Sequence, residues 1–389
     1  MPDKPIMNDL FHDFAKHTRQ DWLKAAALEA EGKNPDEALS WKVGKVTGRA
    51  YYDKIDLSEN NFQLPPAANP YLGNRAWNNL PLITVQTEEQ SNKIALNHLQ
   101  NGADGVLFDI RTKPSINLDQ LLEGIEWPYC MIGFWGNENS AKSLNSIPAF
   151  IQKKKWDSKS AHGFFIWDSV PKNTTDYSVG FDSLPNFRVF TIQSEGTDAV
   201  AQVSDLISKG ITLLESTRNP KQIAFSISIG TDYFLEIAKL KALKFLWLEI
   251  ANSHEKSFQL QDVFVHGQSE PWINDNFQPN SNMLKSTIAS MAAIAGGCDA
   301  LTVYPEKEED SNMNRIARNV SNVLREESHF SKVADATAGA YYVESLTNQI
   351  IQQVKGMSKS EFRSPKAEVR NSKFEIRNSS FNIQGSRTH

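Results

Sequence analysis

The sequence predicts an α/β fold in which eight parallel strands, each followed by a helical segment, close into a β/α barrel of the TIM type. From Pro81 onward, short β-branched or aromatic runs alternate with longer stretches of helical periodicity, which is typical of βα units. Eight such units that close on themselves form a barrel. The expected strands are 106–110, 130–135, 163–167, 188–193, 222–228, 262–266, 300–304 and, most weakly, 332–334.

The helix after the fifth expected strand shows its pattern most clearly. Thr231 or Asp232 is expected as its N-cap, and apolar residues follow at helical spacing along one stripe. Lys239, Lys241 and Lys244 are interpreted as a solvated face, in preference to an anion-binding face. The stripe comprises Phe234, Ile237, Ala238, Ala242, Phe245 and Leu246.

Residues 1–80 are expected to form a helical and extended arm ahead of the barrel at 81–355. Phe11, Phe14, Thr18, Trp22 and Ala25 follow helical spacing and predict an amphipathic helix. Two interpretations remain open: the helix folds back on its own barrel, or a partner chain covers its apolar face.

Residues 356–389 are expected to be a disordered polar tail, because the apolar period disappears after Gly356.

The net charge of −5 offers no broad electrostatic footprint for nucleic acid. Cys130 and Cys298 are expected as buried thiols of a reduced compartment. With no signal-peptide pattern and no long apolar run, we expect a cytoplasmic protein without a membrane partner.

Several motifs occur in an order that one known family shares. The run 223–247 and the segment His266-Gly-Gln268-Ser269 with Trp272 are followed by 291–297 and 338–344. Together they resemble the methylmalonyl-CoA mutase family, and Trp22 and Trp41 resemble the N-terminal arm of its small, or beta, subunits. The resemblance covers about residues 10–355. It implies the barrel fold, and it implies an isomerase that interconverts methylmalonyl-CoA and succinyl-CoA with adenosylcobalamin.

The residues at several positions depart from the family's site pattern. Thr191 stands where the family has an active-site histidine, and Phe264 where it has an arginine suited to an anionic substrate. Asp299 and Thr302 bound a segment that resembles the family's Gln-Ser-Leu-His run, and we expect the acid at Asp299 to repel such a substrate. These departures predict a non-catalytic chain.

The family's cobalamin signature, Asp-x-His-x-x-Gly, has no counterpart among the histidines of this sequence. The segment after Gly356 is also short and polar, so we expect no C-terminal cobalamin-binding domain. The chain alone is therefore expected to bind no cofactor, and the resemblance implies adenosylcobalamin in a large catalytic partner chain of a heterodimer.

Four polar residues at or just past expected strand ends are candidates for a remnant of the substrate pocket: Gln193, His266, Gln268 and Tyr304. The favoured interpretation of His266 is a hydrogen-bonded histidine in the barrel mouth. Asp109 and Asp168 also end strands, and we expect them to cap the following helices.

The main hypothesis is therefore a non-catalytic small subunit whose partner holds the active site. One alternative is a divergent acyl-CoA mutase barrel that uses a separate cobalamin-binding chain. Another is a stand-alone barrel that binds acyl-CoA.

Overall fold

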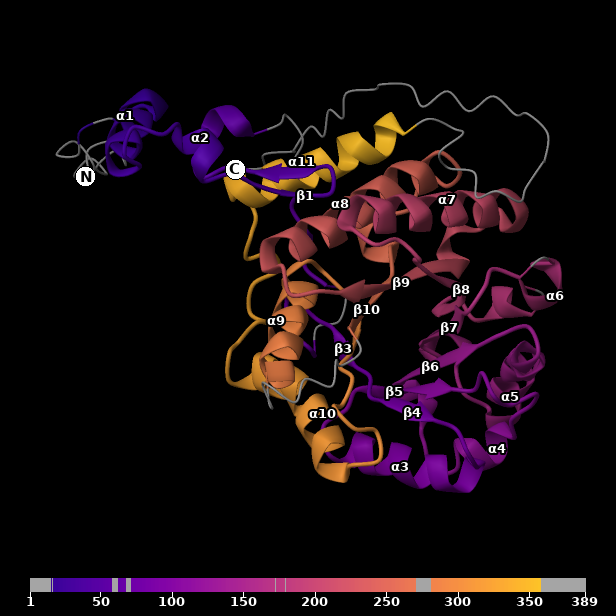
Figure 1. Ribbon diagram of the computed structural model, residues 1–389. Coiled ribbons are helices and arrows are strands. Elements are labelled where there is room, and N and C mark those ends of the chain that lie inside the picture. The colour runs from indigo at the N-terminus through magenta and orange to yellow at the C-terminus, as the bar shows by residue number, and fades with distance from the viewer. Residues whose placement is uncertain are drawn as a thin grey trace, which may run out of the picture.

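The computed structural model describes residues 15, 17–57, 62–67, 71–171, 173–178, 180–270 and 281–357. A nine-stranded sheet lies at its centre (Figure 1), and every neighbouring pair of its strands is parallel. In spatial order the strands are β3 (Asn78–Asn79), β11 (Ala300–Thr302), β10 (Val265–Ser269), β9 (Ile223–Ile229), β8 (Phe187–Gln193), β7 (Gly163–Trp167), β6 (Met131–Gly136), β5 (Gly105–Asp109) and β4 (Leu82–Thr84).

One short piece of chain holds both edges of this sheet. Only Leu80 and Pro81 separate β3 at one edge from β4 at the other. The Leu80 N–H donates to the carbonyl of Leu301 in β11 at 2.9 Å, and the Leu107 N–H of β5 donates to the carbonyl of Pro81 at 3.0 Å. The sheet therefore curls until its edges approach each other, as a barrel requires.

Helices cover the outer face of the curled sheet (Figure 1). The helix α8 is central to this layer, because it packs against α7, α9 and α11. The helices are α3 (Glu88–Gln100), α4 (Leu118–Leu121), α5 (Ile147–Lys154), α6 (Thr175–Ser178), α7 (Ala199–Thr217), α8 (Tyr233–Asn252), α9 (Ser281–Ala295), α10 (Ser311–Glu326) and α11 (Tyr341–Gly356).

The expected α/β barrel class agrees with this arrangement, and seven of the eight expected strands overlap β5 to β11. The eighth, at 332–334, is wrong. This segment forms no strand and, together with Ser331 directly before it, holds the chain before β3: the Arg75 N–H donates to the Ser331 carbonyl at 3.0 Å, and Arg75 Nη1 donates to the Ala334 carbonyl at 3.2 Å. The pieces β3 and β4 take its place in the sheet, and Pro81 between them interrupts any run long enough to predict a strand.

Side chains inside the curled sheet form their own apolar cluster. In β7, Phe164 and Ile166 point inward, whereas Phe165 and Trp167 join the outer core beneath the helices, as the alternation along a strand requires. The interior of the barrel, called the lumen below, is thus a packed core. Its cluster comprises Leu80, Leu107, Met131, Phe164, Ile166 and Ala300, with Leu82, Trp135 and Phe264 packed against them.

The N-terminal arm contains α1 (Arg19–Glu29), α2 (Pro35–Ala38) and a hairpin of β1 (Trp41–Val43) and β2 (Val46–Gly48). A helix is present as α1, with Thr18 as its N-cap, but its apolar residues do not gather on one face, so the predicted amphipathic character is wrong for the described part; Phe11 and Phe14 lie outside the described residues. No residue of α1 is buried, and Figure 1 shows α1 and α2 standing to one side of the sheet. The hairpin docks on α11, where the Trp41 indole donates to the Tyr342 hydroxyl at 3.2 Å.

The expected tail begins where the described chain ends. Helix α11 runs to Gly356, and residues 358–389 lie outside the described residues, so the predicted disorder there stays a prediction. The expected boundary between arm and barrel falls in the joint between β3 and β4. None of the described helices combines the length and the apolar character needed to cross a membrane.

The expectation of a solvated lysine face on α8 is wrong. Lys239, Lys241 and Lys244 are only 1%, 0% and 3% exposed. Lys239 donates to the Ser228 carbonyl of β9 at 2.8 Å, and Lys241 lies 2.8 Å from a carboxylate oxygen of Asp335. Each ammonium group has a partner, which a buried charge needs.

Candidate functional site

His266 lies inside the lumen with both ring nitrogens engaged. Nδ1 lies 2.9 Å from the Ser226 hydroxyl and Nε2 lies 2.8 Å from the Thr302 hydroxyl. Thr302 donates its own proton to the Leu80 carbonyl at 2.8 Å, so its oxygen accepts from Nε2–H while Nδ1 accepts from Ser226. Burial lowers the pKa of His266 to about 3. The ring is therefore neutral near pH 7 and is held in one tautomer.

Aromatic rings fill the lumen around this histidine. The Phe164 ring centroid lies 5.2 Å from that of His266 and 5.2 Å from that of Phe264. Thr191 is also fully buried there, and its hydroxyl oxygen has no hydrogen-bond partner among the described residues. These side chains close the middle of the barrel.

Three of the candidate residues meet at the carboxyl ends of the strands. The Tyr304 hydroxyl donates to Gln268 Oε1 at 3.0 Å, and Gln268 Nε2 donates to Gln193 Oε1 at 3.4 Å. Burial raises the pKa of Tyr304 to about 12, so the phenol keeps its proton. This network can bind a polar group, but none of its members carries a charge near pH 7.

Arg111, which the sequence analysis did not name as a candidate, pairs with two aspartates at the same end of the barrel. Arg111 makes two bonds to Asp109, at 2.9 and 2.6 Å, lies 3.8 Å from Asp168, and sits 3.8 Å above the Trp135 ring. Trp135 donates to Asp168 at 2.8 Å. The capping prediction for Asp109 is wrong, since Asn117 caps α4. The two aspartates share one cation and do not form an acid–base pair.

The expected diverged positions do not gather in one place. Phe264 and Asp299 directly precede β10 and β11, so they lie at the amino ends of the strands, away from Tyr304. The Asp299 carboxylate accepts from Lys244 Nζ at 2.8 Å and from the Val265 N–H at 2.8 Å. Its charge is compensated there, so it does not repel an anion at the carboxyl mouth.

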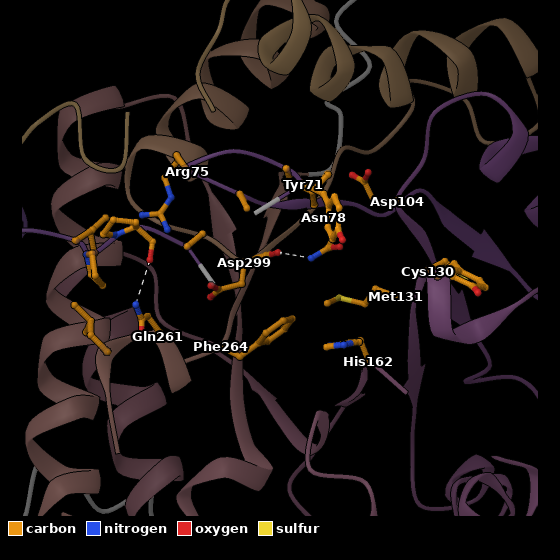
Figure 2. A pocket seen from close by; sticks show the side chains of 18 of the residues that line it. Tyr71, Arg75, Asn78, Asp104, Cys130, Met131, His162, Gln261, Phe264 and Asp299 are labelled. Atoms are coloured by element: carbon orange, nitrogen blue, oxygen red, sulfur yellow. Dashed lines mark hydrogen bonds between the residues drawn. The ribbon is translucent and has the colours of Figure 1, made fainter. Parts of the chain in front are cut away.

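A cavity of about 740 Å³ opens at this amino end. Figure 2 shows Met131, His162 and Phe264 directed toward the same space, and Met131 and Phe264 also belong to the lumen cluster. The packed lumen therefore separates the cavity from the polar residues at the carboxyl end. Residues at the beginnings of several strands line it: Asn78, Asp104, Met131, His162, Phe264 and Asp299.

A metal ion would need several His, Cys, Asp or Glu side chains grouped around it. In the ranges that the structure covers, no three His, Cys, Asp or Glu side chains are grouped to hold an ion. His266 does not fit as a cobalt ligand, because both its nitrogens are bonded and its ring is fully buried.

Two signals in the sequence could have identified the missed residues. Arg111 stands two positions after the strand-end Asp109, close enough to fold back on it. The apolar residues of α8 surround its whole circumference, which is typical of a buried helix. Lysines in such a helix must reach buried partners, as Lys244 does.

The sequence matches a family model described as methylmalonyl-CoA mutase over residues 191–360. It is 27% identical over 384 residues to the methylmalonyl-CoA mutase small subunit of Porphyromonas gingivalis, covering 88% of this chain and 62% of that one. The small subunit of Streptomyces virginiae is 24% identical, with 90% and 64% covered. The chain is therefore similar to methylmalonyl-CoA mutases over most of its length.

The family match extends to proteins from animals. The human mitochondrial methylmalonyl-CoA mutase is 23% identical, with 87% of this chain and 56% of the human protein covered. The chain thus spans less than two thirds of the length of these relatives. The matched region 191–360 contains Gln193, His266, Gln268 and Tyr304, whereas Arg111 lies before it.

Proposed function

We propose that this chain is a small, non-catalytic subunit of an adenosylcobalamin-dependent methylmalonyl-CoA mutase. In this proposal it forms a heterodimer with a large catalytic chain, which holds the cofactor and interconverts methylmalonyl-CoA and succinyl-CoA. The names of two relatives support a subunit role, since both are called methylmalonyl-CoA mutase small subunit.

The filled lumen is the observation that carries this proposal. Radical chemistry on a thioester requires a cavity that surrounds the reacting carbons and excludes water. Here the Phe164 ring packs against those of Phe264, at the amino end of the barrel, and of His266, and Phe164 and His266 are fully buried. A substrate on the barrel axis would have to displace this core, which costs several kcal/mol for even one large side chain.

The charges near the lumen also favour a non-catalytic role. An anionic thioester needs a cation with capacity to spare, but Arg111 is already bonded to Asp109 and faces Asp168. His266 has both nitrogens occupied and a pKa lowered by burial, so it is unsuited to carrying a proton near pH 7. Neither Arg111 nor His266 is therefore available for the roles that a catalytic barrel would need.

We further propose that β3 and β4 count as one interrupted strand, which makes the sheet a closed barrel of eight strands. The hydrogen bonds of Leu80 to β11 and of Pro81 to β5 support this count. We also propose that the protein is cytoplasmic and that this chain alone binds no cofactor, in line with the poor fit of His266 as a cobalt ligand.

The N-terminal arm is the proposed contact with the large chain. Helix α1 has no buried residue, and its Leu28 is 83% exposed. The arm is nevertheless fixed to the rest of the chain, because Trp22 stacks on Tyr51 at 4.9 Å and Arg19 pairs with Asp56 at 3.5 Å. The helix is therefore anchored to the chain while the described residues leave its faces uncovered, which makes it accessible to a partner.

Co-expression with a large methylmalonyl-CoA mutase chain tests the proposal. We expect the two chains to co-purify as a heterodimer and the complex to convert methylmalonyl-CoA, while this chain alone shows no turnover with added adenosylcobalamin. A chain that remains separate from the large subunit contradicts the proposal. Turnover with a separate cobalamin-binding protein and no large chain supports the divergent-mutase alternative instead.

A further inference from the structure

A cluster of three charged residues lies buried where helix α8 packs against α11. It consists of Lys241 of α8, Asp335 in the segment before α11, and Glu344 of α11. The side chains of Lys241 and Asp335 are fully buried, and that of Glu344 is 4% exposed. Two acidic groups therefore share one ammonium group away from water. A second negative charge in such a place is costly unless a further cation pairs with it.

The two acidic groups are bound unequally. Asp335 lies 2.8 Å from the Lys241 ammonium nitrogen and accepts from the Leu64 N–H at 2.9 Å. It also accepts from the N–H and the hydroxyl of Thr337, both at 2.9 Å. Glu344 lies 3.9 Å from the ammonium nitrogen, receives two backbone N–H donors, one of them at 3.4 Å, and its Oε2 has no hydrogen-bond partner among the described residues. Asp335 is therefore the better stabilised carboxylate, and Glu344 is the group suited to keep a proton.

The pKa values of the two acidic groups move in opposite directions. Burial raises the pKa of Glu344, and Lys241 offsets this only in part. Burial also acts on Asp335, but the ammonium group and the backbone donors outweigh it, so the pKa of Asp335 is lowered.

Other charges near α11 are paired elsewhere or exposed. Helices α7 and α8, strand β2 and the 3-10 helix Lys54–Asp56 pack against α11. Their remaining charged residues are Glu236 with Lys239, Lys244 with Asp299, Glu249 with Lys355, Asp205 with Lys209, Asp56 with Arg49, and the exposed Glu215 and Lys54. Within the described part of the chain, Lys241 is thus the cation of this cluster.

The cluster also anchors residues 62–67, which lie between the arm and the barrel in the sequence. The Leu64 N–H bonds directly to Asp335, and the backbone N–H of Phe62 acts on Glu344. The Phe62 ring packs edge-on against Phe245 of α8, with ring centroids 5.3 Å apart. An opening that admits water to Glu344 therefore also releases this segment.

We propose that Lys241, Asp335 and Glu344 form a pH-sensitive junction, in which Glu344 holds a proton in weakly acidic solution and releases it as the pH rises. With the proton, one ammonium group faces one carboxylate; after its release, the ammonium group faces two. An opening that hydrates Glu344 restores its ordinary pKa of about 4.5, so the closed junction binds the proton more tightly than the open one. Opening is therefore favoured as the pH rises above this value. The junction goes beyond the proposed subunit role and concerns this chain by itself.

Hydrogen exchange of the Leu64 amide in the full chain measures the opening, because this N–H bonds to Asp335. Protection is expressed relative to the intrinsic exchange rate at each pH. We expect the protection of residues 62–64 to fall about threefold or more between about pH 5 and pH 8. Protection that stays constant or rises over this range contradicts the release of a proton.

Two glutamate variants locate the proton. Glu344→Gln copies the shape of the protonated acid and cannot ionise, so its protection of residues 62–64 should not vary with pH and should equal or exceed that of the unmodified chain at about pH 8. Glu326→Gln, at an exposed position of α10, should keep the fall.

A purely structural ion pair gives a different result, since Glu344→Gln would then lose protection at every pH. That outcome, or an unchanged fall in the folded variant, overturns the proposal. If Glu344→Gln does not fold, the pH dependence of protection in the unmodified chain decides.

Discussion

His266 shows how the surroundings of a single residue decide its chemistry. From the sequence alone, a histidine near the end of a barrel strand is a candidate catalytic residue. In the structure it is fully buried, it accepts from Ser226 and donates to Thr302, and burial lowers its pKa to about 3. Its role is to satisfy two hydroxyl groups inside the core.

The stability of the protein should therefore depend on pH through His266. The His266 ring has a pKa of about 6.5 in the unfolded chain and about 3 in the folded protein. Between these two pH values the unfolded chain therefore binds a proton on this ring and the folded protein does not. Stabilisation is thus complete above pH 6.5 and is lost as the pH falls, by up to about 1.4 kcal/mol per pH unit. Urea unfolding at pH 7, 6 and 5 should show this slope.

Two histidine variants isolate the contribution of His266 to the pH dependence of stability. His266→Gln should reduce the slope between pH 6 and 5, whereas exposed His254→Gln should leave it unchanged. A slope that is the same in His266→Gln and in the unmodified chain contradicts the buried neutral ring.

The lysines of helix α8 contact strand β9, the segment before α11 and the amino end of β11. Lys239 bonds to β9, Lys241 pairs with Asp335 in the segment before α11, and Lys244 bonds to Asp299 at the amino end of β11. Glu344 of α11 lies 3.9 Å from Lys241, and burial raises the pKa of its carboxyl group. These contacts give the helix a defined rotation and position.

Replacement of Lys241 should strongly destabilise the folded protein. Lys241→Met leaves the carboxylate of Asp335 buried without its cation, so we expect a loss of about 3–5 kcal/mol in the free energy of unfolding. Lys93→Met removes an exposed lysine that pairs with Glu89 and should change stability little. Denaturant unfolding compares the two variants, and equal small effects would refute the structural role of the buried pair.

Element patterns explain which parts of the fold could be predicted. The expected strands at 262–266 and 300–304 overlap β10 and β11 only in part, whereas strands β5 to β9 were predictable because apolar β-branched or aromatic residues dominate each of them. The pieces β3 and β4 were not, since two asparagines and Pro81 interrupt that segment and its pairing partners, β11 and β5, are distant in sequence. Charge alone favours a solvated face for the lysines of α8, whereas the apolar residues on every side of the helix indicate that it is buried.

Across the whole molecule, the lumen changes character from one end to the other. Apolar residues such as Met131 and Phe264 fill its amino end, and a polar network around Gln268 and Tyr304 occupies its carboxyl end. The sequence could indicate Gln193, Gln268 and Tyr304 as neighbours, because strand ends meet at one edge of a parallel sheet. It could not indicate the cavity at the amino end, which depends on how the loops there pack.

The arm should contribute to assembly with the large chain. Leu28→Glu places a charge on the exposed side of α1, so we expect about tenfold or more weaker association, as for loss of a buried interface leucine. Ile94→Glu on α3, which is 39% exposed, should have little effect. Titration of labelled variants with the large chain measures both. Equal affinity of the Leu28 variant and the unmodified chain would remove α1 from the interface.

The central claim is that the barrel of this chain takes no part in the reaction. The most direct test of this claim is the turnover of methylmalonyl-CoA by the two-chain complex. In that complex this chain carries Gln268→Ala and Tyr304→Phe, which remove the polar network at the carboxyl mouth. We expect the rate to equal that of the unmodified complex. A loss of tenfold or more, in a complex shown to remain assembled, would contradict the account.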